Sequence, residues 1–216
     1  MEEKTFVDDI NRSVYDIKNE ENDSYRIKQG LTPEIVEKIS EEKHDPAWMR
    51  EFRLKSLEIY NNMQVPDWGP SIDGLNMDNI ATYVRANTNM KGDWKDVPEE
   101  IKDTFDRLGI PKAERESLAG VGAQYDSELV YHNVRKEVAD QGVVYTDMES
   151  ALTGEYADMV HEHFMKLITP QDHKFAALHG AVWSGGSFVY VPKGVNLEIP
   201  LHCLLYTSDA ADDLIG

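Results

Sequence analysis

The sequence contains a single cysteine, Cys203, among its 216 residues, so no disulfide can form within the chain. It has no apolar run near the about 18 residues that a membrane-spanning helix needs. Basic residues are scarce, because 22 lysines and arginines stand against 40 aspartates and glutamates, for a formal net charge of -18. Such a surface repels nucleic-acid phosphates and anionic lipids, so we expect neither nucleic acid nor membrane among the partners.

The N-terminus lacks the basic segment followed by an apolar core that marks a secretory signal peptide. The near-absence of cysteine also fits a reducing compartment, so we expect a cytoplasmic protein. Hydrophobic residues make up 41% of the sequence and charged residues 29%, a balance typical of a folded globular chain rather than a disordered one.

Helix-start signals dominate the first 170 residues, after a polar arm that we place at residues 1–30. Thr32-Pro33 supplies an N-cap and a first-turn proline, and Asp45-Pro46 repeats this arrangement. Pro98 and Pro111 open two further predicted helices. These signals predict a helical N-terminal part.

Two later stretches are less uniform. Residues 122–133 fit either an extended segment or the approach to a helix, and the sequence leaves both open. Thr146 and Glu149 have the spacing of a capping box, which predicts a helix after a short extended run at 143–145. The helical pattern then continues toward Pro170.

The pattern changes after Pro170. Short apolar runs at 181–183, 187–191 and 195–199 are separated by glycine and proline, which predicts strands. The sequence therefore predicts an α+β fold class, with a helical domain over 31–170 and β structure after it.

Three histidines are the first candidates for a metal site: His161, His163 and His173. Residues two apart on a helix point about 200° apart, so His161 and His163 cannot easily share one ion. Surface or core histidines are therefore the commoner interpretation.

Two glycine-containing stretches resemble known motifs only in part. Gly120 and Gly122 fit the start of a dinucleotide-binding loop, but Tyr125 stands where the third glycine is needed. The stretch WSGGSF at 183–188 lacks the order G-x-S-x-G of a nucleophile elbow, so a tight turn is the simpler interpretation. We therefore assign no catalytic, cofactor-binding or metal-binding residue, and we expect the chain not to be an enzyme.

Four stretches carry a recognisable pattern: 15–40, 122–133, 141–152 and 174–201. Within the last of them, the run SGGSFVYVPKGV at 184–195 is the most specific. Together they resemble the SufB family, the iron–sulfur cluster assembly subunit of the SUF system. The resemblance implies a helical N-terminal domain, a right-handed parallel β-helix and a C-terminal helical segment.

The same resemblance implies a function and a set of partners. SufB-type proteins are scaffolds on which nascent iron–sulfur clusters form before transfer to apoproteins. They work in a SufBCD complex with the ATPase SufC and the SufB paralogue SufD. Sulfur reaches them from the SufS desulfurase through a SufE or SufU carrier.

Members of this family are usually longer, and the pattern stops after Leu201, so the resemblance predicts a truncated chain. On this interpretation residues 171–202 are the first strands of the β-helix. Residues 203–216 resemble the translation of a sequencing adapter, and we predict that they are a non-native tail. The resemblance implies an iron–sulfur cluster on the full-length protein and none on this chain, so Cys203 is not predicted to be a cluster ligand.

Two other functions stay open at this stage. One is a stand-alone acidic interaction module with no role in cluster assembly. The other is an enzyme that uses His161, His163 or His173. Pull-down of SufC or SufD by the full-length product separates the scaffold from the module.

Overall fold

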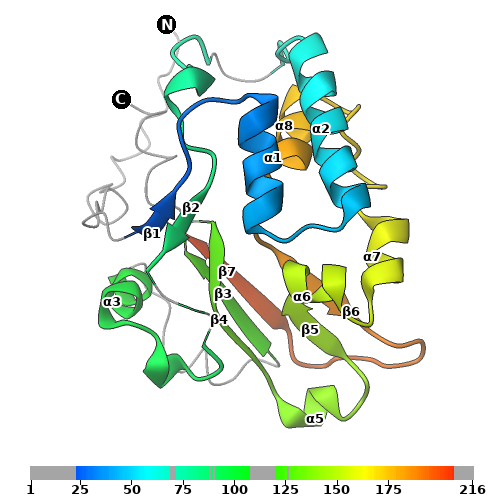
Figure 1. The fold of residues 1–216 in the computed structure, drawn as a ribbon. Helices are drawn as coiled ribbons and strands as arrows, with labels where there is room; N and C mark the ends of the chain where they lie inside the picture. Colours follow the sequence, from blue (N-terminus) through cyan, green and yellow to red (C-terminus); the bar gives the residue numbers. More distant parts are fainter. Residues whose placement is uncertain are drawn as a thin grey trace, which may run out of the picture.

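The computed structural model describes residues 23–68, 72–87, 89, 91–107, 120–125 and 127–206. Figure 1 shows a group of helices lying above several short strands. The predicted α+β fold class is confirmed, because helices are combined with small, mainly antiparallel sheets. None of the helices in the described ranges is long and apolar enough to cross a membrane.

Three helices form the upper layer: α1 (Pro33–Glu42), α2 (Ala47–Asn62) and α8 (Lys174–Val182). Helix α1 begins where predicted, because Thr32 Oγ1 accepts a hydrogen bond from the Ile35 amide at 3.4 Å. Val36 of α1 packs with Leu57 of α2 and Ala181 of α8. Each of the three helices therefore contributes to one shared core.

Helix α8 corrects the prediction that the chain after Pro170 consists of strands. The strand predicted at 181–183 is wrong, because α8 runs through Val182. The buried residues of α8 are all small, which lets the helix approach α2 closely. A Cβ atom on Gly180 would lie 2.7 Å from Ser56 Oγ of α2. Gly180 therefore serves close helix packing and does not break the helix.

Within the described residues, seven strands form three small sheets. Strands β1 (Asp23–Arg26) and β2 (Val84–Ala86) pair antiparallel, and so do β5 (Val144–Asp147) and β6 (Ser187–Tyr190). Strand β3 (Gly120–Tyr125) lies between β4 (Glu128–Val134), which is antiparallel to it, and β7 (Leu201–Tyr206), which is parallel.

The strands settle several predictions. Residues 122–125 lie in β3 and residues 128–133 in β4, and the two strands pair antiparallel, so the extended alternative is correct. Strands β5 and β6 confirm the extended runs predicted at 143–145 and 187–191. Residues 195–199, by contrast, form no strand. Strands β1 to β5 precede Pro170, so the part of the chain before that residue contains more strand than the extended run predicted at 143–145.

Strand β7 contains the predicted start of the non-native tail, and its backbone pairs with β3 from Leu201 to Tyr206. Residues 207–216 lie outside the described part of the chain. One parallel strand pair does not make a β-helix, so the predicted start of a β-helix stays a prediction, as do the limits of the domains.

The remaining helices are short: η2 (Met77–Asn79), η3 (Trp94–Asp96), α3 (Glu99–Arg107), α5 (Lys136–Ala139), α6 (Met148–Thr153) and α7 (Ala157–His163). Helix α3 confirms the helix predicted from Pro98. The helix predicted from Pro111 lies outside the described residues.

Two predicted helix limits need correction. Helix α6 is capped by Asp147, whose Oδ1 accepts a hydrogen bond from the Ser150 amide at 2.8 Å, and not by Thr146. Helix α7 ends at His163 and does not continue toward Pro170. Met165 shortly after it adopts a φ of 47°, which is incompatible with a continuing right-handed helix.

Two apolar clusters stabilise the lower part of the molecule. One lies between α3 and the strands and contains Ala86, Val97, Ile101, Phe105, Ala123 and Val130. The other lies beneath the helical layer and contains Met49, Ala151, Leu152, Val160 and Trp183. Trp183 directly follows α8, so the end of this helix is fixed inside the second cluster.

Candidate functional site: the junction between α8 and β6

The α8–β6 junction, residues 183–186, leads from the helical layer into strand β6 and contains the start of the run SGGSFVYVPKGV. Two glycines determine its path. Gly186 has a φ of +152°, and a Cβ on Gly185 would lie 2.7 Å from Gln124 Oε1 of β3. A side chain at Gly185 would have to displace Gln124, and one at Gly186 would be strained. The glycines of this run therefore serve chain geometry.

Arg53 of α2 holds the end of α8 at the junction. Its Nη1 donates hydrogen bonds to the backbone oxygens of Trp183 at 2.6 Å and Ala181 at 3.3 Å. Its guanidinium also lies over the Trp183 ring, 4.6 Å from the centroid. Carbonyls at the end of a helix have no partner within the helix, and Arg53 supplies one. Helix α2 therefore fixes the point at which α8 ends.

Asp45 balances the charge of Arg53. The Arg53 Nε donates to Asp45 Oδ2 at 2.6 Å, and both side chains are 0% exposed. Burial lowers the pKa of Arg53, while the Asp45 carboxylate acts in the opposite direction. Arginine titrates so far above neutral pH that the guanidinium stays charged. Because Asp45 is used in this pair, it does not cap α2 as predicted; the N-cap position is Pro46, which makes no side-chain hydrogen bond.

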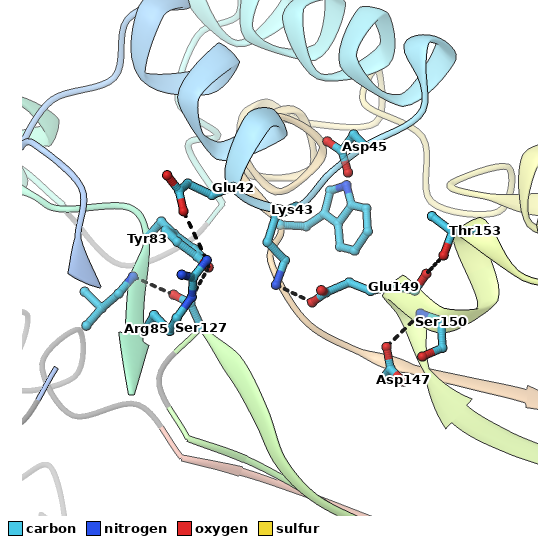
Figure 2. A network of polar contacts seen from close by, with 12 residues as sticks. Glu42, Lys43, Asp45, Tyr83, Arg85, Ser127, Asp147, Glu149, Ser150 and Thr153 are labelled. Carbon is cyan, nitrogen blue, oxygen red and sulfur yellow. Dashed lines mark hydrogen bonds and ion pairs between the residues drawn. The ribbon is translucent and has the colours of Figure 1, made fainter. Parts of the chain in front are cut away.

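A second group of charges, of which Lys43 is buried and the others are partly exposed, joins the helical layer to the strands, as Figure 2 shows. The Lys43 side chain is 1% exposed, and its Nζ forms an ion pair with Glu149 Oε1 of α6. The same Nζ lies 5.5 Å from the centroid of the Tyr83 ring. Arg85 of β2 donates to Glu42 Oε2 at 3.2 Å and to Tyr83 Oη at 3.0 Å. These pairs connect α1, β2 and α6 through groups of opposite charge.

The three histidines considered from the sequence have separate structural contacts. The His161 ring stacks on Trp48, with centroids 4.3 Å apart. His163 is exposed at the last position of α7. His173 is the N-cap of α8, because its Nδ1 accepts hydrogen bonds from two amides of the first turn at 3.1 and 3.2 Å. Across the residues that the structure describes, no group of three or more His, Cys, Asp or Glu side chains could hold a metal ion.

The other sequence candidates lie in strands. Gly120 and Gly122 belong to β3 and are followed by a hairpin, so they form no phosphate-binding turn before a helix. Ser187 begins β6, and its hydroxyl lies 3.5 Å from Tyr145 Oη. Cys203 lies in β7, where its backbone position is opposite Gly122.

Sequence reasoning missed the buried charges. Arg53 offered a usable signal, because it lies four residues from both Met49 and Leu57, which are buried on α2. A charge on an apolar helix face requires a partner. The partner itself could not be found from the sequence, since Asp45 lies next to Pro46 and has the appearance of a helix cap.

Comparison with known proteins places these features in a family. A model of the SufBD protein N-terminal region matches residues 35–203 of the chain. The chain belongs to the SufBD family. It is 52% identical over 193 residues to the iron-sulfur cluster assembly protein SufB of Bacillus subtilis. It is 47% identical over 193 residues to an iron-sulfur cluster assembly SufBD family protein of Staphylococcus haemolyticus. The resemblance to SufB is thereby confirmed.

The two SufBD relatives are much longer than the region of similarity. Each alignment covers 89% of this chain and 41% of the relative. The chain thus spans about two fifths of the length of these SufBD proteins. The Arg53–Asp45 pair, the Lys43–Glu149 pair and the α8–β6 junction all lie inside the region that matches the family.

Proposed function

We propose that this chain forms the N-terminal part of a SufB-type scaffold, on which nascent iron–sulfur clusters form before their transfer to apoproteins. The observation that carries the proposal is the family match over residues 35–203, together with 52% identity to a SufB protein. The cluster is the cargo of such a scaffold. We propose that its ligands lie in the part of SufB-type proteins that this chain does not cover, and that the chain itself is not an enzyme.

The proposed role of this region is to position the start of a parallel β-helix. Leu201 and His202 are the two residues of β7 that precede the predicted non-native tail, and they pair parallel with Gly120 and Val121 of β3. This pairing supports the proposal, because a parallel β-helix is built from strands paired in that way. The Arg53–Asp45 pair and the glycines of the junction fix where the chain leaves α8 and enters β6. Residues 171–202 would then deliver the chain to the first rungs.

The proposed partners are those of a cytoplasmic SUF system. They are the SufC ATPase, the paralogue SufD, and the SufS desulfurase with a SufE or SufU carrier. The sequence contains no phosphate-binding loop of its own, which supports a division of labour in which SufC hydrolyses the nucleotide.

A hybrid protein tests the proposal. Residues 35–201 of this chain replace the matching segment of Bacillus subtilis SufB, and the hybrid is produced in B. subtilis cells depleted of their own SufB. We expect restored growth, co-purification of SufC and SufD, and the visible absorption of a cluster after reconstitution with iron and sulfide. A hybrid carrying Arg53→Met should lose these properties, whereas one carrying Arg50→Met should keep them, because Arg50 lies on the exposed side of α2.

Two results would contradict the proposal. A folded hybrid that binds neither SufC nor SufD would favour the acidic interaction module without a cluster role. A hybrid that binds both but supports neither growth nor cluster formation would show that this region is not that of a SufB-type scaffold.

A further inference from the structure

A pocket of about 480 Å³ lies beside the C-terminal end of α2 and the first turn of α8. Tyr60 and Phe175 form its aromatic walls, and Ile72, Leu75 and Met77 add aliphatic surface. Polar and charged groups make up the rest of the lining, so the pocket offers both an apolar contact and polar partners to a bound segment. This one is large enough for a bulky side chain together with the backbone next to it.

Lys174 lines the pocket, but its ammonium group binds the backbone at the end of α2. Lys174 Nζ donates hydrogen bonds to the backbone oxygens of Tyr60 at 3.0 Å and Met63 at 2.9 Å. It also lies 4.3 Å from the centroid of the Tyr60 ring. Carbonyls at the C-terminal end of a helix carry partial negative charge, which these contacts offset. The carboxylates of the lining are those of Asp67 and Asp73, which form its acidic rim.

The edge of the pocket exposes large apolar side chains. Val65, which lines the pocket, is 46% exposed. Trp68, next in sequence to Asp67, is 77% exposed, and its ring meets the edge of the His173 ring with 6.1 Å between centroids. Exposed aromatic side chains beside a pocket mark interaction surfaces, and tryptophan is among the residues that contribute most to binding.

We propose that this pocket docks a basic peptide segment of a partner protein. An aromatic or aliphatic anchor side chain of the segment enters between Tyr60 and Phe175, and lysine or arginine side chains flanking the anchor face Asp67 and Asp73. Charge complementarity selects this occupant, because the acidic rim and the net charge of -18 both disfavour an acidic segment. The inference uses the pocket alone and holds whether or not the scaffold function is correct.

Defined peptides test the inference with the full chain. The probe is the capped tripeptide Lys-Phe-Lys, and the reporter is the indole N–H signal of Trp68 in a proton–nitrogen NMR spectrum, assigned with Trp68→Phe. We expect this probe to shift the Trp68 signal. Replacing the central Phe by Gly should weaken binding about 10- to 100-fold, because the buried apolar surface is lost. The capped peptide Glu-Phe-Glu should bind more weakly than the lysine peptide.

Matched variants separate the rim charge from the overall charge. Asp67→Asn should weaken Lys-Phe-Lys binding about two- to fivefold, as expected for an exposed ion pair. Glu51→Gln removes the same charge from an exposed position of α2 that does not line the pocket, and it should change binding little. Raising the salt concentration from about 50 to about 300 mM should weaken binding of the lysine peptide.

Three outcomes would overturn the inference. The first is an unchanged Trp68 signal at the highest soluble concentration of Lys-Phe-Lys. The second is binding of Glu-Phe-Glu that is as tight as that of the lysine peptide. The third is an equal effect of Asp67→Asn and Glu51→Gln in variants whose circular dichroism matches that of the parent chain.

Discussion

Replacing Arg53 by methionine should destabilise the fold strongly. The substitution keeps most of the side-chain volume but removes the cation from a site where both Arg53 and Asp45 are 0% exposed. Asp45 is then left as a buried carboxylate without its partner, and the carbonyls of Ala181 and Trp183 lose their donor. Breaking a buried ion pair from one side typically costs about 3–5 kcal/mol. We expect a loss of that size in the free energy of unfolding.

The double variant Asp45→Leu/Arg53→Met separates the cost of an unpaired buried carboxylate from the other effects of losing Arg53. It removes both charges, so no uncompensated carboxylate remains, and the residual cost comes from the two carbonyls. We therefore expect a loss of about 1–3 kcal/mol, smaller than that of the single variant. On the same helix, Arg50→Met breaks the exposed pair with Glu37, at 2.8 Å, and should cost less than about 1 kcal/mol.

Urea unfolding at neutral pH measures these differences. Circular dichroism follows the helices, and tryptophan fluorescence is sensitive to the site because Trp183 lies against the Arg53 guanidinium. The free energy of unfolding is obtained by linear extrapolation to zero denaturant. The reasoning is refuted if Arg53→Met costs less than about 1 kcal/mol, or if the double variant is no more stable than the single one.

Three further substitutions have defined outcomes. In chemical denaturation, His173→Ala should lower the free energy of unfolding by about 1 kcal/mol, because α8 loses its N-cap. His173→Asn should restore this stability, because asparagine is also a good N-cap; a role of His173 as metal ligand would not predict that restoration. Gly180→Ala should cost about 1–3 kcal/mol because the new Cβ would lie 2.7 Å from Ser56 Oγ and 3.0 Å from Ser56 Cβ of α2, whereas Gly74→Ala, with nothing within 4 Å, should be close to neutral in the same assay. Partial burial, with a smaller contribution from the Arg53 charge, lowers the pKa of His179 from its ordinary value of 6.5, although the residue is exposed, so protonation favours the unfolded chain. The contribution of His179 to stability should therefore be fully present above pH 6.5 and be lost as the pH drops through the folded pKa. This loss of stability should be smaller in His179→Gln, and a loss of equal size in both proteins would contradict the prediction.

Local signals in the sequence predicted the elements whose ends are determined by nearby residues. Thr32 caps α1, and Pro98 precedes α3, because a cap or a first-turn proline acts within a few residues. Alternation and glycine spacing likewise located β6. The capping-box pattern was less precise where two neighbouring residues could both cap a helix. Asp147 caps α6 in place of Thr146, which precedes it by one residue.

Helix α8 was missed because its determinants are tertiary. Its buried face consists of alanines and Gly180, which give no stripe of large apolar residues and which resemble the breaks between short strands. The helix is stabilised by close contact with α2, where Ser56 occupies the space that a larger residue at position 180 would need. Such complementarity depends on a residue more than a hundred positions earlier in the chain. Arg53 and its bonds to the end of α8 escaped prediction for the same reason.

The position of the Arg53–Asp45 pair explains why two charged residues occupy a buried site that apolar residues could fill. A buried pair usually contributes little net stability compared with hydrophobic packing, but it demands a defined geometry. Arg53 can meet Asp45 and the Trp183 carbonyl together only if α8 ends at Val182. Because Ser187 pairs with Asp147 only four residues after Trp183, a shift at the end of α8 would disturb the β5–β6 register. The ion pair therefore fixes the geometry of the segment that leads from α8 into β6, and an apolar replacement would fill the same space without specifying that geometry.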